Sequence, residues 1–124
     1  MITHKNLVIA THKNLVTALV KPADVLYSEL TTSDANLIHM TMGISGEAGE
    51  LLDAIKKGVI YRKPLDRTNI IEELGDLEFY LEGLRQELRI DREECLQANI
   101  AKLSERYKKL TFSNEAAIAR EDKQ

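Results

Sequence analysis

The chain has few of the residues that interrupt helices or form covalent cross-links. It contains two prolines, no tryptophan and a single cysteine in 124 residues. One cysteine, Cys95, excludes an internal disulfide and fits the reducing cytoplasm, where we expect the protein to work. Abundant Leu, Ala, Glu and Lys, with so little proline, favour helix over sheet. The composition therefore predicts an all-α protein.

Long apolar runs and an excess of positive charge are also missing. No stretch approaches the roughly 20 apolar residues that a membrane-spanning helix needs, and the first residues lack the features of a secretory signal. The formal net charge of −3 argues against a basic surface for nucleic acid. We therefore expect neither a membrane nor a nucleic acid as a partner.

The length of 124 residues fits one domain, in which two regions differ in character. Residues 1–33 form an N-terminal extension with an eight-residue tandem repeat, in which 3–10 resembles 11–18. Such a period drifts by about 80° per copy around an α-helix and builds no continuous seam. We assign the repeat no chemistry and place the core of the domain in residues 34–122.

Two long helices are predicted inside this core. Apolar residues recur at alternating spacings of three and four over 34–57 and again over 67–88. This is the stripe of helices that pack along their length. Gly58 ends the first helix, and Asp66 is in position to cap the second. The two helices should form an antiparallel hairpin.

Shorter helices are expected around this hairpin. One covers 23–30, another runs from a capping box that begins at Asp91 to about residue 109, and a last one follows a cap at Ser113. Together the elements predict a hairpin-based bundle of three to five helices. Their stripes offer more apolar face than so small a monomer can cover, which predicts a four-helix core completed by oligomerisation.

Four carboxylates occupy mirrored positions on the two long helices. They form two Glu-x-x-acid pairs: Glu47 with Glu50, and Glu73 with Asp76. In a hairpin that turns over residues 58–64, position 50 lies level with 73 and position 47 with 76, because both pairs have the same midpoint. Carboxylates at one level repel each other unless cations neutralise them, so the register predicts a divalent metal site. The alternative is two ordinary solvated acidic flanks.

The type of ligand narrows the choice of metal. All-oxygen sites favour Mg²⁺, Mn²⁺ or Ca²⁺ over zinc or copper. Di-iron bundles use a Glu-x-x-His pattern, which this chain lacks. Mg²⁺ bridging to substrate phosphates fits best, with Mn²⁺ as a substitute. His39, two turns before Glu47, is interpreted as a residue of the helix interface rather than a ligand.

Positive and polar side chains stand where a polyphosphate would need them. They form one group at the hairpin turn and one along a flank of the third long helix: Lys56, Lys57, Arg62 and Lys63, then Asn99, Lys102 and Arg106. Cations beside a metal–carboxylate site are suited to holding a polyphosphate tail. For any single member, a surface salt bridge is the alternative.

Glycines lie at regular spacing inside the first long helix. Gly43, Gly46 and Gly49 are three apart, and Gly75 lies inside the second acidic motif. Each costs about 1 kcal/mol relative to alanine in a helix. A missing side chain permits close approach by another helix or a ligand. The alternative is a weak, locally bent helix.

Several segments together carry a resemblance to a known family. They are Gly46-Glu47-Ala48-Gly49-Glu50-Leu51-Leu52-Asp53, Ile71-Glu72-Glu73-Leu74-Gly75-Asp76-Leu77, Lys56-Lys57, Tyr61, Lys63-Pro64-Leu65-Asp66, Asn99 with Lys102, Arg106 and Tyr107, and the tail from Phe112 to Asp122. With these segments the chain resembles the MazG-like all-α nucleoside triphosphate pyrophosphohydrolases, in their compact, phage-type branch. The resemblance covers roughly residues 34–122.

This resemblance implies Mg²⁺-dependent hydrolysis of a (deoxy)nucleoside triphosphate to the monophosphate and pyrophosphate, in the service of nucleotide-pool house-cleaning. It also implies a homodimer or homotetramer. The metal ligands would be Glu47, Glu50, Glu73 and Asp76, and the substrate would meet Lys56, Lys57, Tyr61, Lys63, Asn99, Lys102 and Arg106. Glu47 or Glu50, acting through a water, would be the general base. Many members carry paired Glu where this chain has Gly46, which leaves that choice open.

Three other functions share parts of this pattern. A phosphoribosyl-ATP pyrophosphohydrolase has similar acidic motifs, although the Lys-Pro-Leu-Asp turn and the tail favour the MazG-like branch. A non-catalytic helical protein that regulates a partner or binds nucleotides is the second alternative. The third is a passive metal-binding bundle. The four intact acids argue against a protein that has lost catalysis, whereas a passive metal-binding bundle would bind a cation but leave nucleotides untouched.

Overall fold

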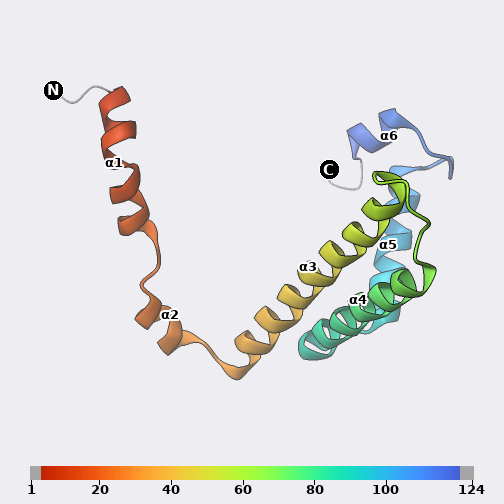
Figure 1. The fold of residues 1–124 in the computed structure, drawn as a ribbon, viewed down its shortest axis with the longest axis horizontal. Helices are drawn as coiled ribbons and strands as arrows, with labels where there is room; N and C mark the ends of the chain where they lie inside the picture. The colour runs from red at the N-terminus through yellow and green to blue at the C-terminus, as the bar shows by residue number, and fades with distance from the viewer. Residues whose placement is uncertain (1–3, 121–124) are drawn as a thin grey trace. The chain divides into compact units, whose positions relative to one another are not determined.

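The computed structural model describes residues 4–120, with side chains from residue 11 onwards. The described residues form six helices and no strand (Figure 1), which confirms the all-α class. None of these helices is long and apolar enough to cross a membrane. The side chains of the first repeat copy, and tail residues 121 and 122, lie outside the described residues.

The chain divides into two compact units between Asp34 and Ala35. The first unit contains α1 (His4–Leu19) and α2 (Ala23–Glu29). Helix α2 is the helix expected over 23–30, and Pro22 stands at its N-cap. Helix α1 covers the tandem repeat and was not predicted, because an eight-residue period gives no helical apolar stripe to recognise. The assignment of the chain to a single domain stays a prediction.

Helix α3 (Thr32–Val59) is 28 residues long and begins at a capping box. The hydroxyl of Thr31 accepts a hydrogen bond from the Asp34 N–H at 3.0 Å, and the Thr31 N–H donates to the Asp34 carboxylate at 3.0 Å. Both bonds hold the pKa of Asp34 below its ordinary value, and the bond from the Thr31 backbone N–H has the larger effect. Satisfying these end groups fixes where the long helix starts.

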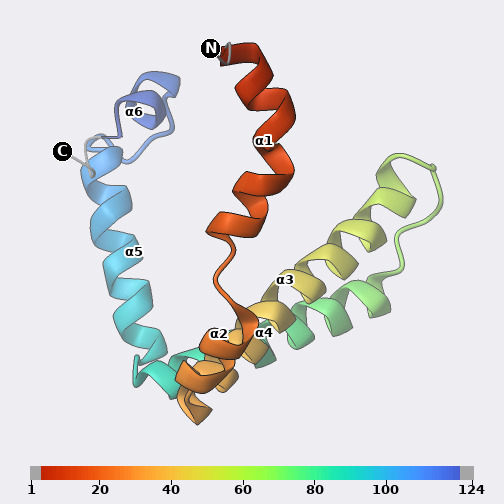
Figure 2. The same cartoon turned by 90° about the vertical axis from the view of Figure 1, so that its left-hand side faces the viewer.

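Helix α4 (Arg67–Leu88) returns antiparallel to α3 after a short turn. The expected cap is confirmed: Asp66 accepts from the Asn69 N–H at 3.0 Å. Within the turn, Arg62 has a φ of 56°, and the Lys63 N–H donates to the Lys57 carbonyl at 3.2 Å. Figures 1 and 2 both show α3 and α4 side by side.

Contacts between α3 and α4 confirm the register predicted for the hairpin. Asn36 donates to Glu87 at 3.2 Å, Met40 lies against Gly83, and Gly43 lies against the Tyr80 ring. Each of these pairs has the same midpoint in the sequence as residues 47 and 76. The carboxylates therefore sit in the middle of one continuous antiparallel packing.

The packed face of each helix follows most of its apolar stripe but also takes in an acid. Covered positions on α3 recur every three or four residues, and Ala54 among them is only 6% exposed. The set includes Leu37, Met40, Ile44, Glu47, Leu51, Ala54 and Gly58. Glu47 and, on α4, Glu73 lie within the packed faces, whereas the apolar residues Ala48 and Ile55 of α3 are exposed. Two carboxylates thus occupy positions that apolar residues usually hold.

Two further helices follow the hairpin. Helix α5 (Arg92–Arg106) leads away from α3 and α4 in Figure 2, and α6 (Asn114–Ala119) follows it. The cap at Ser113 is confirmed by a 3.0 Å bond from the Ala116 N–H. Asp91 stands at the N-cap of α5, but its side chain makes no cap hydrogen bond, so the predicted capping box is wrong.

The cap at Asp66 should stabilise the hairpin measurably. Asp66→Ala removes the acceptor for the Asn69 N–H and should lower the free energy of unfolding by about 1 kcal/mol. Urea denaturation followed by circular dichroism, at fixed protein concentration, measures the change. Asp91→Ala is the matched control, because that cap side chain makes no bond, and its loss should be smaller. Equal losses would contradict the role given to the Asp66 bond.

Candidate metal centre

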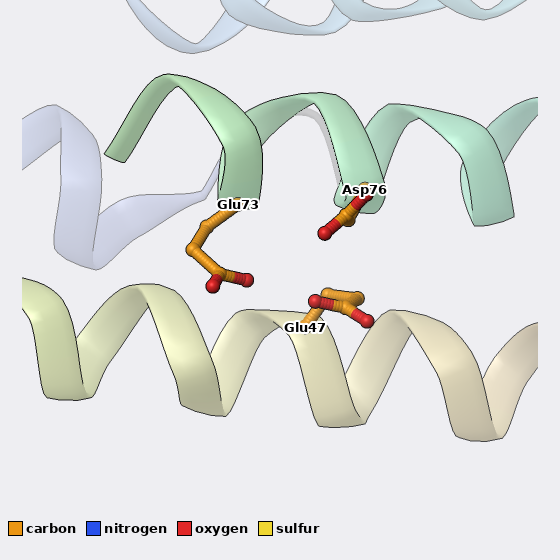
Figure 3. A group of neighbouring side chains, drawn as sticks. All are labelled: Glu47, Glu73 and Asp76. Atoms are coloured by element: carbon orange, nitrogen blue, oxygen red, sulfur yellow. The ribbon is translucent and has the colours of Figure 1, made fainter. Parts of the chain in front are cut away.

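Three carboxylates converge across the seam between α3 and α4. Glu47 projects from α3 toward Glu73 and Asp76 on α4, as Figure 3 shows. One oxygen from each of the three lies within 4.8 Å of the others. Glu73 and Asp76 can face the same partner because residues three apart are neighbours on a helix surface. The hairpin register alone is therefore enough to assemble this group.

No basic side chain of the described residues neutralises these carboxylates. The ion pairs of α3 and α4 lie elsewhere, between Lys57 and Asp53 at 3.2 Å and from Arg85 to Glu82 at 2.9 Å. Glu47 and Glu73 are half-buried, whereas Asp76 is exposed. The negative charges are therefore partly shielded from water without a protein cation beside them.

Glu73 carries most of the resulting electrostatic strain. Its Oε2 is shielded from solvent and has no hydrogen-bond partner. Two carboxylates can share a hydrogen bond only when one holds a proton, and this bond with Glu47 is the leading cause that raises the pKa of Glu73. Burial and the charges of Glu47, Asp76 and Glu50 raise it further. Without a cation, the neighbouring acids therefore hold the pKa of Glu73 above its ordinary value.

The fourth acid, Glu50, stands apart from the group of three. It is exposed, and its oxygens do not join the cluster that Glu47, Glu73 and Asp76 form. Its charge nevertheless contributes to the raised pKa of Glu73, so it lies within electrostatic reach. The sequence predicted that all four acids would converge at the seam, whereas the structure brings three of them together and leaves Glu50 outside their group. A role for Glu50 as a metal ligand stays a prediction.

The arrangement fits a divalent cation with oxygen ligands. Oxygens within 4.8 Å of one another can share one Ca²⁺, which lies about 2.3–2.6 Å from its oxygen ligands. Mg²⁺, at about 2.0–2.1 Å, would draw the oxygens to within about 4.2 Å of one another. A shielded carboxylate oxygen without a donor, Oε2 of Glu73, is the kind of atom that a cation would satisfy. The chemistry of the three ligands favours Mg²⁺, Mn²⁺ or Ca²⁺.

Three of the lysines predicted to bind substrate lie at the hairpin turn, and their binding role stays a prediction. The Lys56 ammonium lies 5.4 Å from the centre of the Tyr61 ring, a cation–π contact, and Lys57 pairs with Asp53. Lys63 belongs to the same turn. Lys56 follows Glu50 by six residues, about 9 Å along the helix. These side chains therefore flank the carboxylates from the turn end of the hairpin.

The second predicted group lies on α5. Asn99 is exposed, and Lys102 and Arg106 are half-buried. In Figure 2, α5 leads away from α3 and α4. The contribution of these three side chains to the site stays a prediction.

Sequence reasoning missed an aromatic group beside the carboxylates. Tyr80 packs against Gly43, and its ring meets His39 and Phe79 edge-on at centroid distances of 6.1 and 5.1 Å. The close approach expected at Gly43 is therefore present, whereas a Cβ at Gly46 or Gly49 would meet nothing within 4 Å. The mirrored register could have found Tyr80, because it lies level with Gly43.

Comparison with known proteins assigns the chain to a family. The MazG nucleotide pyrophosphohydrolase domain matches residues 36–111, more than half of the chain. The chain therefore belongs to this family of hydrolases. The match runs from α3 to just beyond α5 and contains every carboxylate of the site.

The chain is also similar to a phage protein. The Gene 37 protein of Mycobacterium phage L5 is 36% identical over 76 residues, which cover 56% of this chain and 65% of that protein. The chain thus spans slightly less than two thirds of this curated relative. No solved structure matches the chain.

The raised pKa of Glu73 predicts that removing its charge stabilises the metal-free chain but weakens the stabilisation by Mg²⁺. Because its pKa is raised, the folded chain binds the Glu73 proton more tightly than the unfolded chain does, so this proton stabilises the fold. The stabilisation is complete below pH 4.5, the ordinary pKa of the group, and is lost as the pH rises through the folded pKa. Glu73→Gln should therefore raise the melting temperature at pH 7 in EDTA, and the gain should shrink toward pH 4.

The same variant should lose most of the increase in melting temperature that Mg²⁺ gives the wild-type chain, because it lacks a ligand. Differential scanning fluorimetry measures both effects. Glu72→Gln, at the exposed neighbouring position, is the control and should retain the Mg²⁺ response. A lower melting temperature for Glu73→Gln in EDTA at pH 7 would contradict the repulsion described above.

Proposed function

We propose that the protein hydrolyses a (deoxy)nucleoside triphosphate to its monophosphate and pyrophosphate, with Mg²⁺ held by the acids of the hairpin. The observation that carries this proposal is the group of Glu47, Glu73 and Asp76, in which a shielded oxygen of Glu73 lacks any donor. Membership of the MazG family supports the reaction class. Mn²⁺ would substitute for Mg²⁺.

The reaction requires the four acids to act in two ways. Water attacks the α-phosphorus, the bond from that phosphorus to the bridging oxygen breaks, and pyrophosphate leaves with that oxygen. Bound Mg²⁺ would supply neutralising charge and polarise the phosphates. Glu47, Glu73 and Asp76 would hold the ion. Glu50, outside their group and exposed, is the acid best placed to accept the proton of the attacking water.

Basic residues at the hairpin turn would hold the leaving end of the triphosphate. Lys56, Lys57 and Lys63 lie on the turn side of the carboxylates, and Tyr61 stacks under Lys56. Their positive charge would stabilise the negative charge that develops on the leaving pyrophosphate as the bond breaks. The proposal therefore places the β- and γ-phosphates toward the turn and the nucleoside toward the opposite end of the hairpin.

We further propose that the active protein is a homo-oligomer. Ala54 is the only described residue whose surface is almost wholly covered, so a single chain has almost no core. Large apolar side chains lie exposed along α3 and α5: Ile38, Met42, Leu52, Val59, Leu96, Ile100 and Leu103. A second copy would cover these faces. It would also allow Asn99, Lys102 and Arg106 of one subunit to reach the phosphates bound at another.

The product pattern tests the reaction. Purified protein incubated with a panel of canonical and modified triphosphates should release monophosphate and pyrophosphate with Mg²⁺, and neither product in EDTA. Asp76→Asn should lower the rate by about two orders of magnitude or more, as expected for a lost metal ligand. Glu78→Gln, an exposed acid near Arg85 on the same helix, should leave the rate unchanged.

Other outcomes would identify the alternatives. Diphosphate with orthophosphate would contradict the proposed cleavage position. Turnover of phosphoribosyl-ATP alone would favour the histidine-pathway type of enzyme. Tight metal binding without any turnover would favour a non-catalytic regulatory, nucleotide-binding or metal-binding protein.

Mixed oligomers test whether two subunits build one site. Lys102→Ala and Asp76→Asn should each be nearly inactive alone, because one loses a phosphate contact and the other a metal ligand. Subunits unfolded together and refolded as a mixture should regain part of the activity if Lys102 contacts the phosphates bound at the neighbouring subunit's carboxylates. A refolded mixture that is no more active than the single variants would contradict a shared site.

A further inference from the structure

One close contact between α3 and α4 lies directly beside the carboxylates. A Cβ atom built on Gly43 would overlap Cγ, Cδ1 and Cε1 of the Tyr80 ring. The two helices therefore approach as closely there as a glycine on one side and a flat ring on the other allow. Among the glycines of α3 and α4 that flank the acids, Gly46, Gly49 and Gly75 have no neighbour within 4 Å of such an atom.

The contact is one helical turn from the metal centre on both helices. Gly43 precedes Glu47 by four residues, and Tyr80 follows Asp76 by four, about 6 Å along each helix axis. A change in helix separation at this point is carried to the carboxylates almost undiminished, because one turn of helix is stiff. The distance from Glu47 to the acids of α4 therefore depends on how Tyr80 sits against Gly43.

The Tyr80 ring has aromatic neighbours on both helices. His39 contacts it edge-on from α3, and Phe79 does so from α4. Its Cγ, one bond from Cβ, is among the overlapping atoms, so an added methyl group would require a new rotamer or a shift of the helix. At Gly83, by contrast, the nearest atom is the sulfur of Met40, the flexible end of a side chain that can move away.

We propose that the Gly43–Tyr80 contact is a positioning element of the metal centre, which sets the helix separation at which Glu47, Glu73 and Asp76 can bind one cation. Tyr80 is a positioning residue here and touches neither metal nor substrate in this role. The inference rests on the metal centre of the proposed function, but it does not depend on which substrate is hydrolysed.

Gly43→Ala in the full chain tests the proposal by metal affinity without any substrate. Mn²⁺ titration, read by electron paramagnetic resonance of the free ion, should give a dissociation constant about tenfold higher than that of the wild type, the size of effect seen when support around a metal site is disturbed. Circular dichroism checks that the variant keeps its helical content.

Two glycine variants separate positioning from general effects. Gly46→Ala, next to Glu47 and with open space at its Cβ, makes the same gain in helix propensity and should bind Mn²⁺ like the wild type. Gly83→Ala disturbs another close contact of the same helices, seven residues from Asp76, and should change stability more than affinity. Equal losses of affinity in Gly43→Ala and Gly83→Ala would overturn the proposal.

A double-mutant cycle identifies the ring as the cause. In a Tyr80→Ala background, where the methyl group meets no ring, Gly43→Ala should no longer weaken Mn²⁺ binding. An equal loss in both backgrounds would overturn the role of Tyr80. If Gly43→Ala does not fold, Tyr80→Leu replaces it, because this variant removes the ring without crowding α3. It should also weaken Mn²⁺ binding about tenfold, and wild-type affinity would overturn the proposal.

Failure of this inference can be distinguished from failure of the proposed function. If the wild-type chain itself does not bind Mn²⁺, the metal centre is wrong. If the wild type binds Mn²⁺ and Gly43→Ala binds it equally well, the metal centre stands and the positioning role is wrong.

Discussion

The packing of α3 against α4 forces negative charges together, and the other features of the site follow from that constraint. Glu47 and Glu73 occupy positions inside the packed faces, and Asp76 joins them at the edge. Carboxylates held this close, partly out of water and without a basic partner, oppose the packing that assembles them. A divalent cation would reverse the sign of this interaction, so folding and metal binding should be linked. The same acids would then serve both the stability of the hairpin and the chemistry that the family performs.

The weakness of the remaining core makes this linkage more important. Only Ala54 is almost wholly covered among the described residues, and many large apolar side chains stay exposed. A hairpin with so little buried surface has few other interactions to offset the repulsion between its acids. Under the proposed function, the oligomer and the bound ion would together supply what the single chain lacks. The contact between Gly43 and Tyr80 would then fix the separation at which the ion is accommodated.

Much of the fold could be predicted from the sequence because its signals are local. Asp66 and Ser113 precede the helices that they cap, and the mirrored spacing of the acids gave the register that Asn36, Glu87, Gly43 and Tyr80 confirm. The rotation of each helix was harder to predict, because the apolar stripe alone does not reveal that Glu47 and Glu73 lie in the packed faces. Helix α1 escaped prediction for a related reason, since its repeat gives no helical stripe.

The contribution of each acid was the least predictable part of the site. Equal spacing placed Glu50 and Asp76 in equivalent positions, yet only Asp76 joins the group with Glu47 and Glu73. That difference depends on small rotations of packed helices, which no pattern of residue types encodes. The placement of Lys102 and Arg106 depends on the direction that α5 takes after α4, and on a second subunit if one contributes. Such long-range geometry lies beyond the reach of periodicity and capping rules.

The most direct test of the account is the anomalous scattering of crystals grown with Mn²⁺. The account predicts a strong peak between α3 and α4 within coordination distance of Glu47, Glu73 and Asp76. Density for Mn²⁺ only at other sites, with these three carboxylates hydrogen-bonded to one another or to lysines instead, would contradict it.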